Sequence, residues 1–186
     1  MSDKSEFDTE KQVILAVQQG VGESFTKLVD LYDKRLLYFV RRLMGDEGHA
    51  QDVMQIVWLT VYRHIDSLRI PEAFRAWVYR IAHDQAVTEL RRRGNRIEVS
   101  IESQPVAILA EDHQSDESVF EHYELVHRGL RELSFEHRRV LTLKFLEDMS
   151  IDQIAEVIQT QPGTVKSRLY YAKSELRHWI EAQLHE

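Results

Sequence analysis

The residues with the clearest chemical potential lie on a predicted helix near the end of the chain. Pro162 suits the first turn of a helix, and Val165 and Leu169 then begin an inward apolar stripe. The outer face and the start of this helix carry small, hydroxyl-bearing or basic residues: Gly163, Thr164, Lys166, Ser167, Arg168, Tyr171 and Lys173. Such a set can contact the base edges and phosphates of a nucleic-acid duplex.

A second, shorter helix is needed to hold this surface in place. Ser150 and Gln153 have the spacing of a capping box, and Ile151, Ile154 and Ile158 then fall on one face. A short helix, a tight turn and a second helix with a basic outer face form the helix-turn-helix layout, whose second helix fits a major groove. The alternative is a packed corner of a helical bundle that contacts no DNA.

A second cluster of basic residues lies in the first half of the chain. Between Phe74 and Arg96 there are six Arg and two acidic residues. Apolar spacing predicts a helix here that begins at Pro71 and stops at Gly94. Aromatic and Arg side chains together suit a single strand, whereas the alternative for the terminal Arg run is a solvated helix end that complements the helix dipole.

The rest of the chain also has helical periodicity, and with three Pro and seven Gly it favours long helices. We predict an all-α fold with two small helical domains, an N-terminal domain at residues 1–96 and a C-terminal helix-turn-helix domain at 119–186. The first helix is expected from near Glu10 to Gly20. After a predicted cap at Ser134, the expected buried face is Val140, Leu141, Phe145 and Leu146.

The segment between these domains is predicted to be an acidic, flexible linker at residues 97–118. The chain has a net charge of −7, and residues 97–124 hold eight acidic side chains and no Lys or Arg. The flanking parts are therefore close to neutral, and the total does not argue against nucleic-acid binding. Because the linker's acids can compete with phosphate for the basic surfaces, the isolated chain is expected to bind duplex poorly.

Several classes of protein are disfavoured. The absence of cysteine excludes disulfides and thiolate chemistry, and we find no phosphate-binding Gly loop, nucleophile elbow or metal-ligand spacing. We therefore expect no enzyme activity, no cofactor and no metal site. Without a long apolar run or a signal peptide, we expect no membrane insertion and a cytoplasmic location. A helix-turn-helix regulator whose N-terminal half senses a ligand or dimerises is the main alternative.

Three segments resemble the extracytoplasmic-function sigma factors of bacterial RNA polymerase. Residues 133–158 and Gly163–Leu169 resemble the domain that reads the minus-thirty-five promoter element, and Ala50–Gln55 resembles the helix that grips the polymerase core. Phe74–Arg93 resembles the segment that reads and melts the minus-ten element. The resemblance spans residues 22–182 and implies a sigma factor whose partners are RNA polymerase core, promoter DNA and, as a further candidate, an anti-sigma factor.

The resemblance also implies roles for individual residues. The outer face of the last helix would read the minus-thirty-five element, and the loop Asp66–Pro71 would form part of a pocket for a flipped base. The candidates for minus-ten contacts are Arg69, Phe74, Arg75, Trp77, Arg80, Asp84, Arg91, Arg92 and Arg93. Phe74 and Trp77 share a helix face with Ile81, and Tyr79 is a further aromatic candidate, so core packing is the alternative for these rings.

The candidates for binding the polymerase core lie at and after the start of the third predicted helix. They are Asp46, Glu47, Asp52, Val53, Gln55, Ile56 and Leu59. Ile56 and Leu59 fall outside the main apolar stripe, which favours a partner groove. The acids alone could instead be explained by the helix dipole.

The chain departs from the family pattern at several positions. Gln159 occupies a turn position where Gly is usual, and Thr160 stands where an apolar residue is usual. Asp84 and Thr88 replace the usual Asn and Asp, and a second acid is missing near Gln51 and Ile56. Promoter sequence and core affinity therefore cannot be transferred from relatives.

Overall fold

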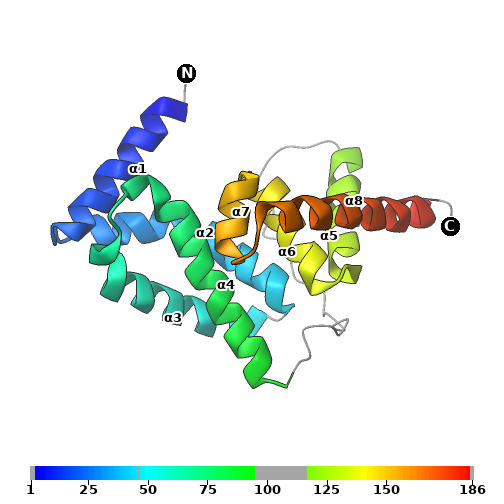
Figure 1. Ribbon diagram of the computed structural model, residues 1–186, viewed down its shortest axis with the longest axis horizontal. Helices are drawn as coiled ribbons and strands as arrows, with labels where there is room; N and C mark the ends of the chain where they lie inside the picture. Colours follow the sequence, from blue (N-terminus) through cyan, green and yellow to red (C-terminus); the bar gives the residue numbers. More distant parts are fainter. Residues whose placement is uncertain (1–2, 46, 95–116, 185–186) are drawn as a thin grey trace.

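The computed structural model describes residues 3–45, 47–94 and 117–184. These residues form helices and turns with no strand among them, which confirms the predicted all-α class (Figure 1). The elements are α1 (Asp3–Gln18), α2 (Ser24–Met44), α3 (Glu47–His64), η1 (Ile65–Ser67), η2 (Pro71–Ala73), α4 (Phe74–Arg92), α5 (Glu117–Glu132), α6 (Phe135–Leu141), η3 (Thr142–Leu146), α7 (Ile151–Val157) and α8 (Pro162–Leu184).

The N-terminal helices α1 to α4 pack around the apolar stripe of α2. Leu28, Leu36 and Phe39 on this stripe are fully buried. The helix ends as predicted at Gly45, whose φ of 70° lies in the left-handed region that favours glycine. The first helix differs from the prediction, because α1 begins at Asp3 rather than near Glu10. No Gly or Pro precedes Thr9, so nothing prevents the helix from extending upstream.

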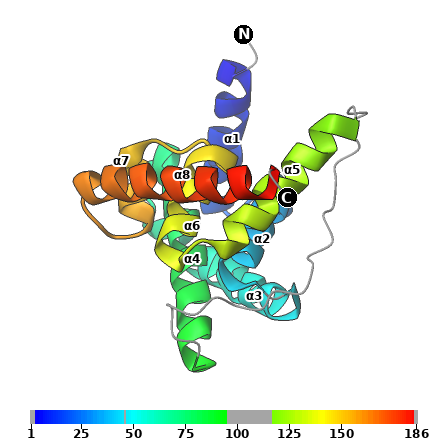
Figure 2. The same ribbon diagram turned by 90° about the vertical axis from the view of Figure 1, so that its right-hand side faces the viewer.

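The C-terminal helices α5 to α8 form the predicted helix-turn-helix region, with α8 lying across α6 (Figure 2). Ser134 caps α6 as predicted, because its side chain accepts a hydrogen bond from the His137 N–H. The expected burial of Phe145 is wrong, since its side chain is 59% exposed. The wide π-helical turn η3 shifts the helical phase, so that Thr142 and Leu143 face the core instead.

Close helix packing within this region depends on Gly129 of α5. A Cβ atom added at Gly129 would lie 2.5 Å from Leu176 Cδ1 and 2.8 Å from Trp179 Cε3, both on α8. A larger residue would therefore force the Leu176 and Trp179 side chains to move.

The two helical groups pack against each other, α7 against α4 and α6 against α2. Their buried apolar residues form one continuous cluster. The linker predicted at 97–118 falls mostly outside the described residues, and α5 already begins at Glu117. No helix within residues 3–45, 47–94 or 117–184 is long and apolar enough to cross a membrane.

Candidate nucleic-acid interface

The α7–α8 corner is held by local interactions that the sequence predicted. The Ser150 hydroxyl accepts a hydrogen bond from the Gln153 N–H, and the Gln153 side chain accepts one from the Ser150 N–H, which completes the capping box. The turn then passes through Gln159, whose φ of 51° is in the left-handed region. Pro162 begins α8, and buried Val165 and Leu169 fix its inner face. The helix-turn-helix geometry is therefore present.

The outer face of α8 leaves most of the predicted duplex-reading residues accessible. Lys166, Ser167 and Lys173 are exposed, and Thr164 is half-buried. Gly163 is also exposed, with open space where a Cβ would lie. These residues present donors and positive charge near the helix start, where duplex-reading helices contact DNA.

Two adjacent tyrosines extend this face of α8. Tyr171 was a candidate from the sequence, whereas Tyr170 was missed although it is 69% exposed. Their rings form an edge-to-face pair with centroids 5.4 Å apart. The Tyr–Tyr pair in the sequence was the available signal for this residue.

Arg168 is placed differently from the prediction. Its guanidinium is half-buried, and Nη2 lies 2.5 Å from Glu136 Oε2 on α6. The same carboxylate oxygen accepts a hydrogen bond of 2.5 Å from Arg139. Arg168 therefore supports the packing of α8 on α6, rather than projecting outward from α8 with Lys166.

The second predicted surface, on α4, is much more buried. The Phe74 side chain is 0% exposed, with its ring 5.1 Å from the Tyr32 ring and 5.9 Å from the Trp77 ring. Tyr79 is 1% exposed and Trp77 is half-buried. Neither ring is open to a base in this arrangement, because Phe74 packs against Tyr32 and Trp77 and Tyr79 is buried with Glu147.

The charged candidates of α4 divide into two groups. Arg80, Arg91, Arg92 and Arg93 are exposed. Arg92 is paired with Glu89 through Nε at 2.7 Å and Nη2 at 2.8 Å, and this hydrogen-bonded pair lowers the pKa of the Glu89 carboxyl. Arg75 and Asp84 are half-buried and hydrogen-bond to Glu147 and Gln159, in the turns after η3 and α7. Only the first group is open to a nucleic-acid backbone in this arrangement.

The loop before α4 is fixed by a residue that the sequence did not single out. The Gln18 amide donates hydrogen bonds of 2.8 Å to the carbonyl oxygens of both Ile65 and Leu68. Arg69 and Ile70 lie exposed beyond this anchor. The loop at residues 66–71 is therefore anchored at Ile65 and Leu68 and exposed at Arg69 and Ile70.

The described candidates for polymerase binding lie on one helix, α3. Asp52 and Gln55 are exposed, and Ile56 and Leu59 are 48% and 47% exposed. Val53 is only 2% exposed, so the prediction of a partner contact for its side chain is wrong. Asp46 lies outside the described residues, and Glu47 is described only as the first residue of α3.

Two further exposed apolar residues, one on α2 and one on α3, were not predicted. Leu31 on α2 and Tyr62 on α3 are 47% and 65% exposed. The Tyr62 ring packs edge to face against Phe25, at 5.2 Å. The side chain of Trp58 ties α3 to α2 by donating a 2.7 Å hydrogen bond to Asp33.

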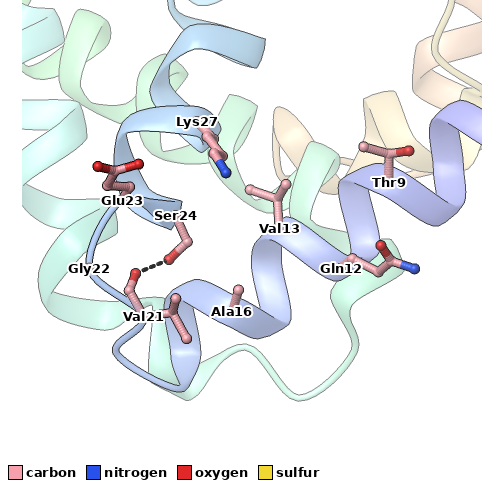
Figure 3. Close-up of a pocket in the computed structure, with 9 residues that line it drawn as sticks. All are labelled: Thr9, Gln12, Val13, Ala16, Val21, Gly22, Glu23, Ser24 and Lys27. Atoms are coloured by element: carbon pink, nitrogen blue, oxygen red, sulfur yellow. Dashed lines mark hydrogen bonds between the residues drawn. The ribbon is translucent and has the colours of Figure 1, made fainter.

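An open cleft of about 530 Å³ separates α1 from the beginning of α2 (Figure 3). Its lining combines one acid, Glu23, and one base, Lys27, with small, polar and aliphatic side chains. The Ser24 hydroxyl in this wall donates a hydrogen bond to the Val21 carbonyl. Among the described residues, no three His, Cys, Asp or Glu side chains are grouped to hold a metal ion. The basic surfaces of α4 and α8 are thus the stronger candidate site.

Two family models match the chain on either side of the predicted linker. Sigma-70 region 2 matches residues 28–96, which include most of α2 and all of α3 and α4. Sigma-70, region 4 matches residues 123–176, which include α6, α7 and most of α8. The two candidate surfaces therefore fall in different matched regions.

Individual proteins match over nearly the whole chain. RNA polymerase sigma-H factor of Pseudomonas aeruginosa is 31% identical over 188 residues, covering 96% of this chain and 97% of that protein. The ECF RNA polymerase sigma factor SigW of Bacillus subtilis is 27% identical over 179 residues, covering 90% of this chain and 94% of SigW. The fold is shared with the sigma factor RpoE from Bartonella quintana, solved in complex with the anti-sigma factor NepR, with a TM-score of 0.70, 21% identity and coverage of 86% of this chain and 98% of that one.

Proposed function

Because the chain belongs to the extracytoplasmic-function family of RNA polymerase sigma factors, we propose how its parts bind polymerase core and direct promoter recognition and opening. The observation that carries the proposal is the presence of two separate basic surfaces, on α4 and α8, in one chain that also exposes apolar residues on α3.

The C-terminal domain, residues 119–186, is assigned to the minus-thirty-five element. Lys166, Ser167 and Lys173 on the exposed face of α8 would contact base edges and phosphates in the major groove. Arg168 would have to leave Glu136 to join them. Its contribution is therefore smaller than that of an arginine already directed at DNA.

The N-terminal domain, residues 1–96, is assigned to core binding and to the minus-ten element. On α3, Asp52 and Gln55 would surround the exposed apolar pair Ile56 and Leu59 in a groove of the polymerase. On α4, the exposed arginines would follow the phosphate backbone. Residues 97–118 would connect the two readers.

Promoter opening by this protein would need no catalytic step. A protein that binds unpaired bases more tightly than paired ones shifts the equilibrium toward open DNA by its differential affinity alone. We therefore assign no enzyme activity and place the protein in the cytoplasm with the polymerase. An anti-sigma protein is included among the proposed partners because the similar RpoE from Bartonella quintana was solved bound to one.

In vitro transcription tests this assignment. Core polymerase is incubated with genomic DNA fragments, with and without the chain, and the transcript ends are mapped. We expect discrete new start sites that appear only when the chain is present. Transcription that is unchanged by the chain would overturn the proposal and favour the helix-turn-helix regulator.

A further inference from the structure

Glu147 is a buried carboxylate of the C-terminal domain whose partners lie in the N-terminal domain. Its side chain is 2% exposed and follows the turn η3. The Tyr79 hydroxyl on α4 donates a hydrogen bond to Oε2, and Arg35 Nε on α2 lies 3.3 Å from the same oxygen. Arg75 on α4 donates to the Glu147 main-chain carbonyl. Three residues of one domain thus hold a single residue of the other.

Such a contact favours one particular packing of the two domains over others. A buried carboxylate is costly unless it is paired and hydrogen-bonded, so Glu147 is stable here only while the other domain supplies its partners. Burial raises the pKa of the Glu147 carboxyl, and the Tyr79 hydroxyl and nearby guanidiniums oppose that rise. When the domains separate fully, water solvates the carboxylate. A partly shifted packing that buries Glu147 without its partners would be disfavoured.

The seam continues from Glu147 toward the middle of α4. Arg139 on α6 donates a 3.0 Å hydrogen bond to His83 Nε2. Gln159, in the turn before α8, donates one of 3.2 Å to the Asp84 carboxylate. Residues 75, 79 and 83 recur every four positions, so they form one stripe along α4 that is turned toward the C-terminal domain.

We propose that Glu147 latches the C-terminal domain onto α2 and α4, and that this closed arrangement covers part of the single-strand-reading face of α4 until the domains separate. The covered part contains Arg75 and Asp84. The inference rests on the proposed function for its DNA consequence, because α4 is assigned there to the minus-ten element. The latch itself depends only on the contacts between the domains.

The closed arrangement affects the two readers unequally. Lys166, Ser167 and Lys173 on α8 are exposed while the domains are packed together. Duplex contact by α8 is therefore sterically open, whereas contact by Arg75 requires separation. The latch acts as a gate for DNA melting rather than for the first encounter with the promoter.

The conformational test measures the separation of the domains in the full chain. Because the chain has no cysteine, Thr26→Cys on α2 and Glu181→Cys on α8 provide two unique sites for spin labels, both exposed. Glu147→Lys should give longer and broader distances than the wild type. Glu156→Lys, the same charge change at an exposed position of α7, should keep the wild-type distribution. Unchanged distances in Glu147→Lys, or a broad distribution already in the wild type, would overturn the latch.

A second variant attacks the latch from the other domain without entering the core. Arg35→Glu removes an ion-pair partner whose side chain is 55% exposed, and Lys34→Glu is its exposed neighbouring control. Arg35→Glu should open the chain as Glu147→Lys does. This variant keeps the test decisive if Glu147→Lys disturbs the C-terminal fold, and a closed distribution in folded Arg35→Glu would contradict the proposal.

The DNA consequence is measured with a random-sequence single-stranded oligonucleotide. If the closed form holds about nine-tenths of the molecules, opening should tighten apparent binding by about tenfold in Glu147→Lys relative to Glu156→Lys. Equal affinities in an opened variant that binds the oligonucleotide would show that the latch covers no DNA-binding surface. An opened variant that binds none would instead refute the assignment of α4, while the latch would stand on its distances.

Discussion

Helices α8 and α4 both carry basic residues assigned to DNA, but the fold leaves them open to different degrees. On α8, Lys166 and Lys173 face solvent. On α4, Phe74 is fully buried and Arg75 binds the carbonyl of Glu147. The apolar pattern of a helix at the edge of a domain therefore indicates which face is exposed, whereas the pattern of a helix packed on several sides does not.

The largest effect is expected from Phe74→Ala, which tests whether this ring belongs to the core or to the DNA surface. Truncation of a fully buried Phe should reduce the free energy of unfolding by about 3–5 kcal/mol. Urea denaturation measures the change, and Tyr62→Ala, at a 65% exposed ring, is the control. A loss below about 1 kcal/mol would return Phe74 to the DNA candidates.

On the exposed face of α8, Lys166→Ala should weaken promoter binding by the holoenzyme while leaving the stability of the fold unchanged. Loss of one phosphate contact should weaken binding of all promoters alike and reduce the salt slope by about one. Binding titrations at several salt concentrations measure both quantities, with Lys27→Ala on α2 as the exposed control. An unchanged salt slope would remove Lys166 from the phosphate-binding set.

Asp52→Lys tests whether the exposed surface of α3 binds the polymerase core. Reversal of an exposed charge beside Ile56 and Leu59 should weaken association with the polymerase core by about tenfold, through lost charge complementarity. Asp30→Lys, an equal charge change at an exposed position of α2, should have little effect. If both variants bind core as the wild type does, α3 is not the contact surface.

The contact between Tyr38 on α2 and His127 on α5 predicts that the stability of the fold depends on pH. Burial, together with the charges of Arg42 and Arg131, lowers the pKa of His127 to about 4, and its ring lies 3.1 Å from the Tyr38 hydroxyl. Because the unfolded chain then binds the proton more readily, stability should fall as pH decreases from 6.5 toward 4.

Allowing for partial exposure, this loss should be about 1 kcal/mol at pH 5. The raised pKa of Glu147 gives the opposite slope, since its protonation favours the folded state at low pH. The measurement is therefore the difference between the wild type and His127→Gln in unfolding free energy at pH 7 and pH 5. Parallel pH profiles for the two proteins would show that His127 does not titrate in this window.

The smallest effect is expected from Gln159→Gly in the turn before α8. Glycine removes the cost of a left-handed backbone, about 1 kcal/mol, and loses the hydrogen bond to Asp84. The net gain in unfolding free energy should be about 0.5 kcal/mol. A net destabilisation, measured by urea denaturation, would mean that the bond to Asp84 outweighs the strain.

The sequence predicted those elements whose signals are local. The capping box at Ser150, the Pro162 start and the Gly45 stop all act within a few residues, and each lies where it was expected. The exposed face of α8 followed from the same periodicity. The unusual Gln159 also marked a real feature, because it adopts the backbone conformation for which glycine is favoured.

Other features depend on contacts between distant residues, which periodicity does not contain. Val53 and Phe74 were assigned to partners, but neighbouring helices cover both. The helical pattern places Arg168 on the outer face of α8, but it does not show that Glu136 on α6 lies close enough to pair with it. Nothing in the sequence around Glu147 indicated burial, since an acid after a turn is usually solvated.

As a sigma factor, the chain should act with the polymerase core as one DNA-binding unit. Size-exclusion chromatography of the chain with core, followed by titration of a promoter fragment with each component, measures this. We predict co-elution with core, and specific duplex binding by the complex but not by the chain alone. A chain that elutes apart from core and binds specific duplex by itself at about 10⁻⁸ M or tighter would contradict the proposed function.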